Sequence, residues 1–182
     1  TGKRVRTETA ISRNPASISS LAASLAAREV KNLQTARVLV IGAGEMAELA
    51  VEALRKRGVN QIIVVNRTLE RAQYLAQHWQ AQVSTFDHLE ALLFEADIVI
   101  SSTSAPHTII EYQLIMDVMS QRNQRVMVMI DIAVPRDIDP AVNQITGIKY
   151  FDIDNLDHQV QGLLADRAAE IPHVEAILTE EE

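Results

Sequence analysis

Short runs of apolar residues alternate along the chain with segments in which apolar residues recur every three or four positions. The short runs are rich in valine and isoleucine, which favours β-strands, and the periodic segments are typical of helices with one buried face. Because the two kinds of segment alternate, the pattern predicts an α/β protein with a Rossmann-like, doubly wound parallel sheet and right-handed crossovers. The six expected strands lie at about 37–41, 61–65, 82–85, 97–100, 126–130 and 149–151.

Helices are expected between these strands and before the first one. Ser17 and Thr68 are the predicted N-caps of two helices, and Asp87 with Glu90 is interpreted as a capping box for a third. One further helical turn is expected to begin at Asp139-Pro140. The predicted helices lie at about 18–32, 45–57, 69–79, 89–94 and 111–121.

After the last strand the pattern changes, and no further sheet element is expected. Asn155 or Asp157 can cap a helix that begins near Leu156, and Pro172 is expected to interrupt it before a second helical stretch at 174–178. This segment is interpreted as the start of a helix that leads out of the domain.

The clearest local motif is a glycine turn directly after the first strand. Residues 38–47 read Val-Leu-Val-Ile-Gly-Ala-Gly-Glu-Met-Ala, the order of strand, tight turn and helix that a dinucleotide site requires. Gly42 permits the turn, Gly44 leaves room for a pyrophosphate, and Ala47 is small enough for the helix to pack closely on the strand. The helix N-terminus offers free N–H groups to the phosphates. The alternative is a tight turn without a ligand.

The residues after the second strand indicate which dinucleotide is bound. An NAD site usually carries a carboxylate there for the ribose 2′-OH, whereas this chain has Asn66-Arg67-Thr68 and no acid before Glu70. Arg67 can pair with a 2′-phosphate and stack on adenine, and its neighbours can add neutral hydrogen bonds. We therefore expect NADP rather than NAD. The alternative is that Thr68 only caps the helix and Arg67 is a solvated surface charge.

Ligands of doubly wound sheets bind at the carboxyl ends of the strands, so the loops 101–107 and 132–136 are also candidates. Ser102 and Thr103 in the first loop, and Ala133 beneath a nicotinamide in the second, are predicted cofactor contacts. His107 is interpreted as a loop-stabilising or surface residue, because no substrate is evident for it. Asp131 is expected to hold its own loop together rather than to act in catalysis.

Arg136 leaves several roles open at this stage. It can bind phosphate, pair with Asp131 or Asp137, or face water.

Composition and charge exclude several classes of chemistry. The chain has 182 residues, a net charge of −7 and no cysteine, so thiol nucleophiles, disulfides and thiolate metal sites are excluded. The five histidines are scattered without ligand spacing and no Ser-His-Asp set is recognisable, so we assign no metal and no catalytic residue. No apolar run is long enough to cross a membrane.

Charge is spread unevenly along the chain. Nine carboxylates stand against one arginine in residues 152–182, whereas residues 1–13 hold four basic residues and one acidic residue. Without a large basic stretch, the chain is a poor candidate for binding nucleic acid by itself. The basic start is interpreted as a solvated linker, with contact to a phosphate backbone as the alternative.

Several motifs that occur in order along the chain resemble those of one known family. Two are specific: Gly-Lys-Arg-Val-Arg-Thr-Glu at 2–8 and Asp-Ile-Ala-Val-Pro-Arg-Asp at 131–137. The glycine turn and Asn66-Arg67-Thr68 are less specific, because shikimate dehydrogenase-like domains share them. Further motifs are Ser-Ile-Ser-Ser at 17–20, Ile-Ser-Ser-Thr at 100–103, Ala-Pro-His at 105–107 and Asp-Ile-Asp-Asn-Leu at 152–156. Together they resemble glutamyl-tRNA reductase, over nearly the whole chain but only the middle of the family's length.

The resemblance implies one part of an enzyme that has three parts. In this family an N-terminal catalytic domain uses a cysteine to form a thioester from glutamyl-tRNA. NADPH then delivers hydride, and glutamate-1-semialdehyde leaves for tetrapyrrole (porphyrin) biosynthesis. A long helix joins these domains to a C-terminal dimerisation domain. Since this chain begins without methionine and lacks cysteine, we expect it to be the NADPH-binding domain, inactive alone.

The same resemblance implies the domain boundaries, the partners and the roles of individual residues. Residues 1–15 are expected to be a linker from the catalytic domain, 16–155 the NADP-binding Rossmann domain, and 156–182 the start of the joining helix. Expected partners are glutamyl-tRNA through the missing domain, a second copy in a full-length homodimer and the downstream aminomutase, in the cytoplasm and away from membranes. The predicted cofactor-binding residues are Gly42, Ala43, Gly44, Glu45, Met46, Ala47, Asn66, Arg67, Thr68, Ser102, Thr103 and Ala133.

Two other functions stay open on the sequence alone. The chain could be the nucleotide domain of a shikimate dehydrogenase-like NADP oxidoreductase, whose Lys/Asp catalytic pair would lie in a missing domain. It could also be a nucleotide-sensing or assembly module without chemistry.

Overall fold

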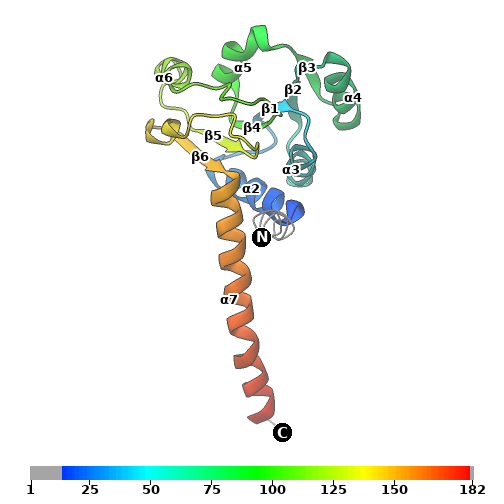
Figure 1. Ribbon diagram of the computed structural model, residues 1–182, viewed down its shortest axis with the longest axis vertical. Helices are drawn as coiled ribbons and strands as arrows, with labels where there is room; N and C mark the ends of the chain where they lie inside the picture. The colour runs from blue at the N-terminus through cyan, green and yellow to red at the C-terminus, as the bar shows by residue number, and fades with distance from the viewer. Residues whose placement is uncertain (1–13, 181–182) are drawn as a thin grey trace, which may run out of the picture.

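The computed structural model describes the backbone of residues 14–180 and the side chains of residues 14–170. The expected linker at 1–15 therefore lies almost wholly outside the described residues. Within them the chain forms a six-stranded, all-parallel sheet in the order β3-β2-β1-β4-β5-β6 (Figure 1). The doubly wound sheet expected from the sequence is confirmed. The strands are β1 (Arg37–Gly42), β2 (Gln61–Val65), β3 (Gln82–Ser84), β4 (Ile98–Ser102), β5 (Met127–Asp131) and β6 (Ile148–Asp152).

The helices connect successive strands and cover both faces of the sheet. They are α2 (Pro15–Glu29), α3 (Glu45–Lys56), α4 (Leu69–Trp79), α5 (Leu89–Glu95), α6 (Tyr112–Ser120) and α7 (Ile153–Glu180), with 3-10 turns η1 (Phe86–His88) and η2 (Pro140–Gln144). The predicted turn at Asp139-Pro140 is confirmed, because the Asp139 carboxylate accepts the Ala141 N–H at 2.9 Å.

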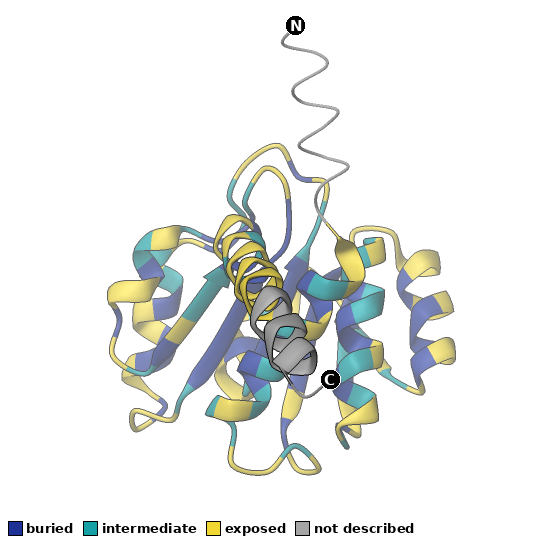
Figure 2. Cartoon of the chain, turned by 90° about the horizontal axis from the view of Figure 1, so that it is seen from below, coloured by how far each residue is buried: buried dark blue, intermediate teal, exposed yellow. Residues whose placement is uncertain are grey.

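Alternate residues of each central strand enter two separate hydrophobic cores. In β1, Val38 and Val40 pack with α2, α3, α4 and the first turns of α7, whereas Leu39 and Ile41 pack with α5, α6 and η2. All four side chains are at most 2 % exposed. Burial on both faces explains why these strands are continuous apolar runs, and Figure 2 shows the sheet as a buried layer between partly exposed helices.

Several predicted helix ends are wrong. Asn14 rather than Ser17 caps α2, because Pro15 occupies the first helical position and the Asn14 side chain accepts the Ser17 N–H at 3.2 Å. Thr68 does stand at the N-cap of α4, but its side chain makes no capping hydrogen bond. The expected capping box is absent, because Asp87 lies inside the turn η1, which runs directly into α5.

The long helix α7 begins earlier and ends later than the sequence pattern indicates. Asp152, not Asn155 or Asp157, caps its start by accepting the Asn155 N–H at 2.8 Å. The backbone stays helical past Pro172, which removes a single N–H from the helical ladder while the bonds on either side continue. Residues 161–170 are all exposed, and α7 projects away from the sheet (Figure 1).

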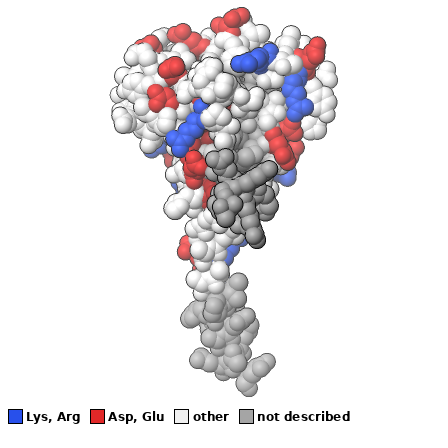
Figure 3. Space-filling view, in the orientation of Figure 1, with Lys and Arg blue, Asp and Glu red and all other residues white. Residues whose placement is uncertain are grey.

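Charge on the globular part is mixed. Figure 3 shows lysine and arginine side chains scattered among acidic ones on the face in view, without a broad basic patch. In the described part of the chain, no helix combines the length and the apolar character that crossing a membrane would need.

Candidate dinucleotide site

A cavity of about 460 Å³ opens at the carboxyl ends of β1, β2 and β4. This is where a doubly wound sheet binds nucleotides. The chain runs from β1 toward one edge of the sheet and then returns to add β4 on the other side of β1, and a crevice forms where the strand order reverses. A volume of this size is within the usual range for small-molecule sites. The cavity is lined by Ala43, Gly44, Asn66, Arg67, Thr68, Phe86, Ser102, Thr103, Ser104, Ala105 and Ile109.

The glycine turn forms the floor of this cavity and is in contact with the end of β4. Gly42 has φ +91°, a left-handed conformation, and a Cβ there would lie 2.4 Å from the Ser102 carbonyl oxygen. A Cβ on Gly44 would lie 2.4 Å from Ser102 Oγ. Gly42 is therefore required by packing against backbone within the chain, whereas at Gly44 the Ser102 hydroxyl would have to move to admit a Cβ.

The helix that follows the turn has the features of a phosphate-binding N-terminus. Gly44, which lines the cavity, is the N-cap of α3, and no described side chain caps the first turn, so the N–H groups of that turn have no side-chain acceptor. Ala47, in the first turn of α3, is fully buried in the hydrophobic core between α3 and the sheet. Ser19 of α2 donates to the Met46 carbonyl at 3.1 Å and so ties α2 to this turn.

The structure brings together most, but not all, of the predicted cofactor residues. Seven of them line the cavity, and whether they contact a cofactor stays a prediction. Of the remainder, Gly42 and Ala47 are buried, Glu45 is exposed on α3, and Met46 and Ala133 are outside the lining. The seven that line the cavity are Ala43, Gly44, Asn66, Arg67, Thr68, Ser102 and Thr103.

Two arginines lie near the β2 side of the cavity, and Arg67 is the one that lines it. Arg67 is exposed at the rim, and no hydrogen bond or ion pair within the described residues occupies its guanidinium. Arg71, one turn into α4, donates to the Ala43 carbonyl at 3.3 Å, pairs with Glu48 at 3.2 Å and stacks on Tyr74. Sequence reasoning missed Arg71, although its position four residues after Arg67 places both side chains near the same end of α4.

Sequence reasoning also missed apolar parts of the cavity wall. Phe86, which follows β3 and is 37 % exposed, faces the cavity together with Ala105 and Ile109. The signal for Phe86 was its position just beyond the carboxyl end of a strand, where ligand loops of such sheets lie.

The loop after β5 is held by two buried aspartates. Asp131 accepts N–H groups of Ala133 at 3.1 Å and Ile138 at 2.8 Å, which confirms that it holds its own loop together. Asp137, also fully buried, instead accepts from the loop after β4, through Ser101 and Thr103.

Arg136 lies in the same loop but pairs with neither of these aspartates. Its guanidinium contacts Asp152 at 3.0 Å and Asp154 at 3.3 Å, at the start of α7. Of the alternatives left open by the sequence, the pairings with Asp131 and Asp137 do not form, because the side chain turns toward the N-terminus of α7, where carboxylates cluster. His107 is exposed in the loop after β4, as expected for a surface residue.

The buried carboxyl group of Asp131 is expected to make the stability of the fold depend on pH. Burial raises the pKa of its carboxyl group to about 6, the backbone N–H groups of Ile138, Ala133 and Asp137 oppose the rise, and the Asp137 charge adds to it. Because the folded pKa lies above the unfolded one, this group stabilises the fold most at low pH and loses that contribution as the pH rises through about 6. We expect the contribution of this group to fall by about 1 kcal/mol between about pH 5 and pH 7.

Chemical denaturation of the wild type and of Asp131→Asn across this range measures the effect. The variant cannot titrate at this position, so the stability difference between the two proteins should change by that amount. A difference independent of pH would show that the carboxyl group does not titrate there.

Comparison with known proteins agrees with this geometry. Residues 24–159 match the family described as Shikimate / quinate 5-dehydrogenase. The glutamyl-tRNA reductase of Syntrophobacter fumaroxidans is 46 % identical over 98 % of this chain, which spans 39 % of that relative. A similar relative from Natranaerobius thermophilus is 43 % identical over the whole chain and is covered to 40 %. The chain thus spans about two fifths of the length of these curated relatives.

A solved structure gives the same result. Glutamyl-tRNA reductase from Methanopyrus kandleri superimposes with a TM-score of 0.79 and 40 % identity, covering 99 % of this chain and 45 % of that one.

Proposed function

Because the chain belongs to the Shikimate / quinate 5-dehydrogenase family, and its relatives above are glutamyl-tRNA reductases, we propose that it is the NADPH-binding domain of such a reductase. The observation that carries the proposal is the cavity over the glycine turn, with Arg67, which pairs with no other residue in the described part of the chain, on its β2 side. When bound, NADPH supplies a hydride. The full-length protein would use it to reduce glutamyl-tRNA to glutamate-1-semialdehyde for porphyrin synthesis.

The residues present fit such a cofactor. The uncapped N-terminus of α3 and the absent side chain of Gly44 suit a pyrophosphate, and Arg67 suits a 2′-phosphate because its planar guanidinium can donate two parallel hydrogen bonds. Among the described residues, no carboxylate lines the β2 side of the cavity to accept a free ribose 2′-OH. These features support NADPH over NADH.

The proposed domain organisation extends beyond the described residues. Residues 1–15 would enter from a catalytic domain that supplies the cysteine, 16–155 would hold NADPH, and α7 from about residue 156 would lead to a dimerisation domain. Glutamyl-tRNA, a second copy of the protein and the downstream aminomutase are the partners that this organisation implies.

Titration with NADPH and NADH tests the cofactor assignment. We expect NADPH to bind this chain more tightly, and Arg67→Ala to weaken NADPH by about 10- to 100-fold, the effect of losing a charge-assisted pair of about 1.5–3 kcal/mol. NADH affinity should be nearly unchanged, because NADH has no 2′-phosphate. Arg57→Ala is the matched control, since Arg57 follows the opposite end of α3. Equal affinity for both nucleotides, or an unaffected Arg67→Ala variant, would contradict the assignment.

The family match also favours a second candidate, a shikimate dehydrogenase-like oxidoreductase. Assays of the full-length protein separate the two. Consumption of NADPH with glutamyl-tRNA supports the reductase, whereas turnover of shikimate without response to glutamyl-tRNA supports the alternative.

A further inference from the structure

We propose that Asp137 is a positioning residue that fixes the wall of the cavity on its β4 side, where the nicotinamide end of NADPH would lie. The inference rests on the proposed function and deepens it. Asp137 lines no part of the cavity and is fully buried, so it can act on a ligand only through the residues that it holds.

The Asp137 carboxylate makes three hydrogen bonds to the end of β4 and the loop that follows. One oxygen accepts the Ser101 hydroxyl at 2.7 Å and the Thr103 N–H at 2.9 Å, and the other accepts the Thr103 hydroxyl at 2.5 Å. Thr103 Oγ1 in turn accepts the Ala105 N–H at 3.2 Å. The backbone from β4 to Ala105 is therefore shaped by one side chain, and the last four residues of this stretch, 102–105, line the cavity.

The far end of the same loop is also bound to Asp137. Its backbone carbonyl accepts the N–H groups of Ile109 at 2.7 Å and Ile110 at 2.9 Å, and Ile109 is part of the cavity wall. Asp137 itself is held by the next peptide, because Ile138 donates to the buried Asp131. Both ends of the wall are thus attached to a rigid anchor at the end of β5.

The strand order places this wall on the nicotinamide side. The glycine turn lies between the end of β2, which carries Arg67, and the end of β4. If Arg67 takes the 2′-phosphate of the adenosine half, a dinucleotide that crosses the turn must place its other half against the β4 loop.

The chemistry of the position favours a role in holding the loop. A buried carboxylate is costly unless it is paired or hydrogen-bonded. No ion pair between described residues includes Asp137, and the adjacent Arg136 pairs with the carboxylates at the start of α7. The three hydrogen bonds to the β4 loop therefore compensate the cost of its burial.

Two ligands separate loop positioning from a general loss of structure. NADPH spans both halves of the site, whereas 2′,5′-ADP occupies only the adenosine half. We expect Asp137→Ala to weaken NADPH binding at least about tenfold, because a loop that is no longer held in place would lose one or two hydrogen bonds to the cofactor. Binding of 2′,5′-ADP should be unchanged.

A conservative variant tests whether the hydrogen bonds or the charge matter. In Asp137→Asn the amide oxygen can accept from Ser101 and the Thr103 N–H, while the amide N–H donates to Thr103 Oγ1, so NADPH binding should be largely retained. Asp139→Ala, which removes a carboxylate that caps η2 only, is the matched control and should bind both ligands as the wild type does.

If Asp137→Ala does not fold, Ser101→Ala replaces it. Ser101 is fully buried, touches no part of the cavity and contacts Asp137 directly, so its loss should weaken NADPH a few-fold and leave 2′,5′-ADP unaffected. Equal weakening of both ligands, or of neither, would overturn the inference while leaving the proposed function standing. A wild-type chain that binds neither ligand would overturn both.

Discussion

Gly42→Ala is expected to destabilise the chain by about 3–5 kcal/mol and to abolish NADPH binding by the fraction that still folds. The left-handed backbone at φ +91° alone costs an alanine about 1–2 kcal/mol. In addition, the new Cβ would lie 2.4 Å from the Ser102 carbonyl oxygen. Because this neighbour is backbone within the β1–β4 ladder, relief requires the two strands to move apart, which opens the floor of the cavity.

Gly162→Ala provides the matched control for this prediction. It makes the same chemical change in the exposed part of α7, where a Cβ would meet nothing within 4 Å. Alanine should stabilise that helix by up to about 1 kcal/mol, since it loses less conformational freedom on folding than glycine does. Urea denaturation followed by circular dichroism measures both variants. A loss below about 1 kcal/mol for Gly42→Ala would show that the turn is not constrained by β4.

The fold of this chain could be predicted from its sequence for a physical reason. A strand buried on both faces must be an apolar run, and β1, β2 and β5 are each bounded by polar or turn residues, so their positions are readable within one or two residues. The ends of the helices were harder to predict, because more than one nearby residue can serve as the cap. Asn14 and Ser17 can both cap, and Pro15 decides between them only when its place at the first helical position is known.

The site was readable only where it is local in sequence. The glycine turn and the segment at 66–68 can be recognised from the spacing of residues that are close in sequence, and both contribute residues to the cavity wall. The contacts of Asp137 and Arg71 could not be found in this way, because partners of these residues lie 34 and 28 residues away in the chain. Their roles depend on which loops the sheet order brings together at its carboxyl edge.

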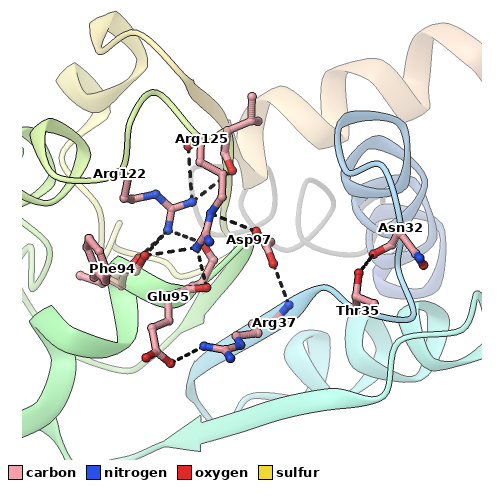
Figure 4. A network of polar contacts seen from close by, with 11 residues as sticks. Asn32, Thr35, Arg37, Phe94, Glu95, Asp97, Arg122 and Arg125 are labelled. Carbon is pink, nitrogen blue, oxygen red and sulfur yellow. Dashed lines mark hydrogen bonds and ion pairs between the residues drawn. The ribbon is translucent and has the colours of Figure 1, made fainter.

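A last example of such non-local dependence lies at the amino ends of the strands, opposite the cavity. Arg122, between α6 and β5, is 5 % exposed and donates through Nη1 to the carbonyls of Leu93 at 3.0 Å, Phe94 at 2.7 Å and Ala96 at 2.7 Å (Figure 4). Through Nη2 it also reaches the carbonyl of Val126 at 3.2 Å. Burial lowers the pKa of its guanidinium to about 10, so the group stays charged at neutral pH.

These carbonyls include those at the end of α5 that have no partner within the helix. Arg122 therefore serves as the C-terminal cap of α5 and joins it to the start of β5. No local sequence pattern reveals this role, because every partner is a backbone oxygen whose side chain is irrelevant to the bond.

Arg122→Met is expected to destabilise the chain by about 3–5 kcal/mol, because it keeps most of the aliphatic volume but leaves several buried carbonyls without donors. Arg125→Met is the control: Arg125 is half-exposed, binds the Phe94 and Glu95 carbonyls from the surface, and should cost about 1 kcal/mol or less. Fluorescence of the single, buried Trp79 during urea unfolding reports both losses. The folded Arg122→Met variant should still bind NADPH, since the cavity lies at the carboxyl ends of the strands, away from Arg122. If it matched the wild type in stability, water rather than Arg122 would be satisfying those carbonyls.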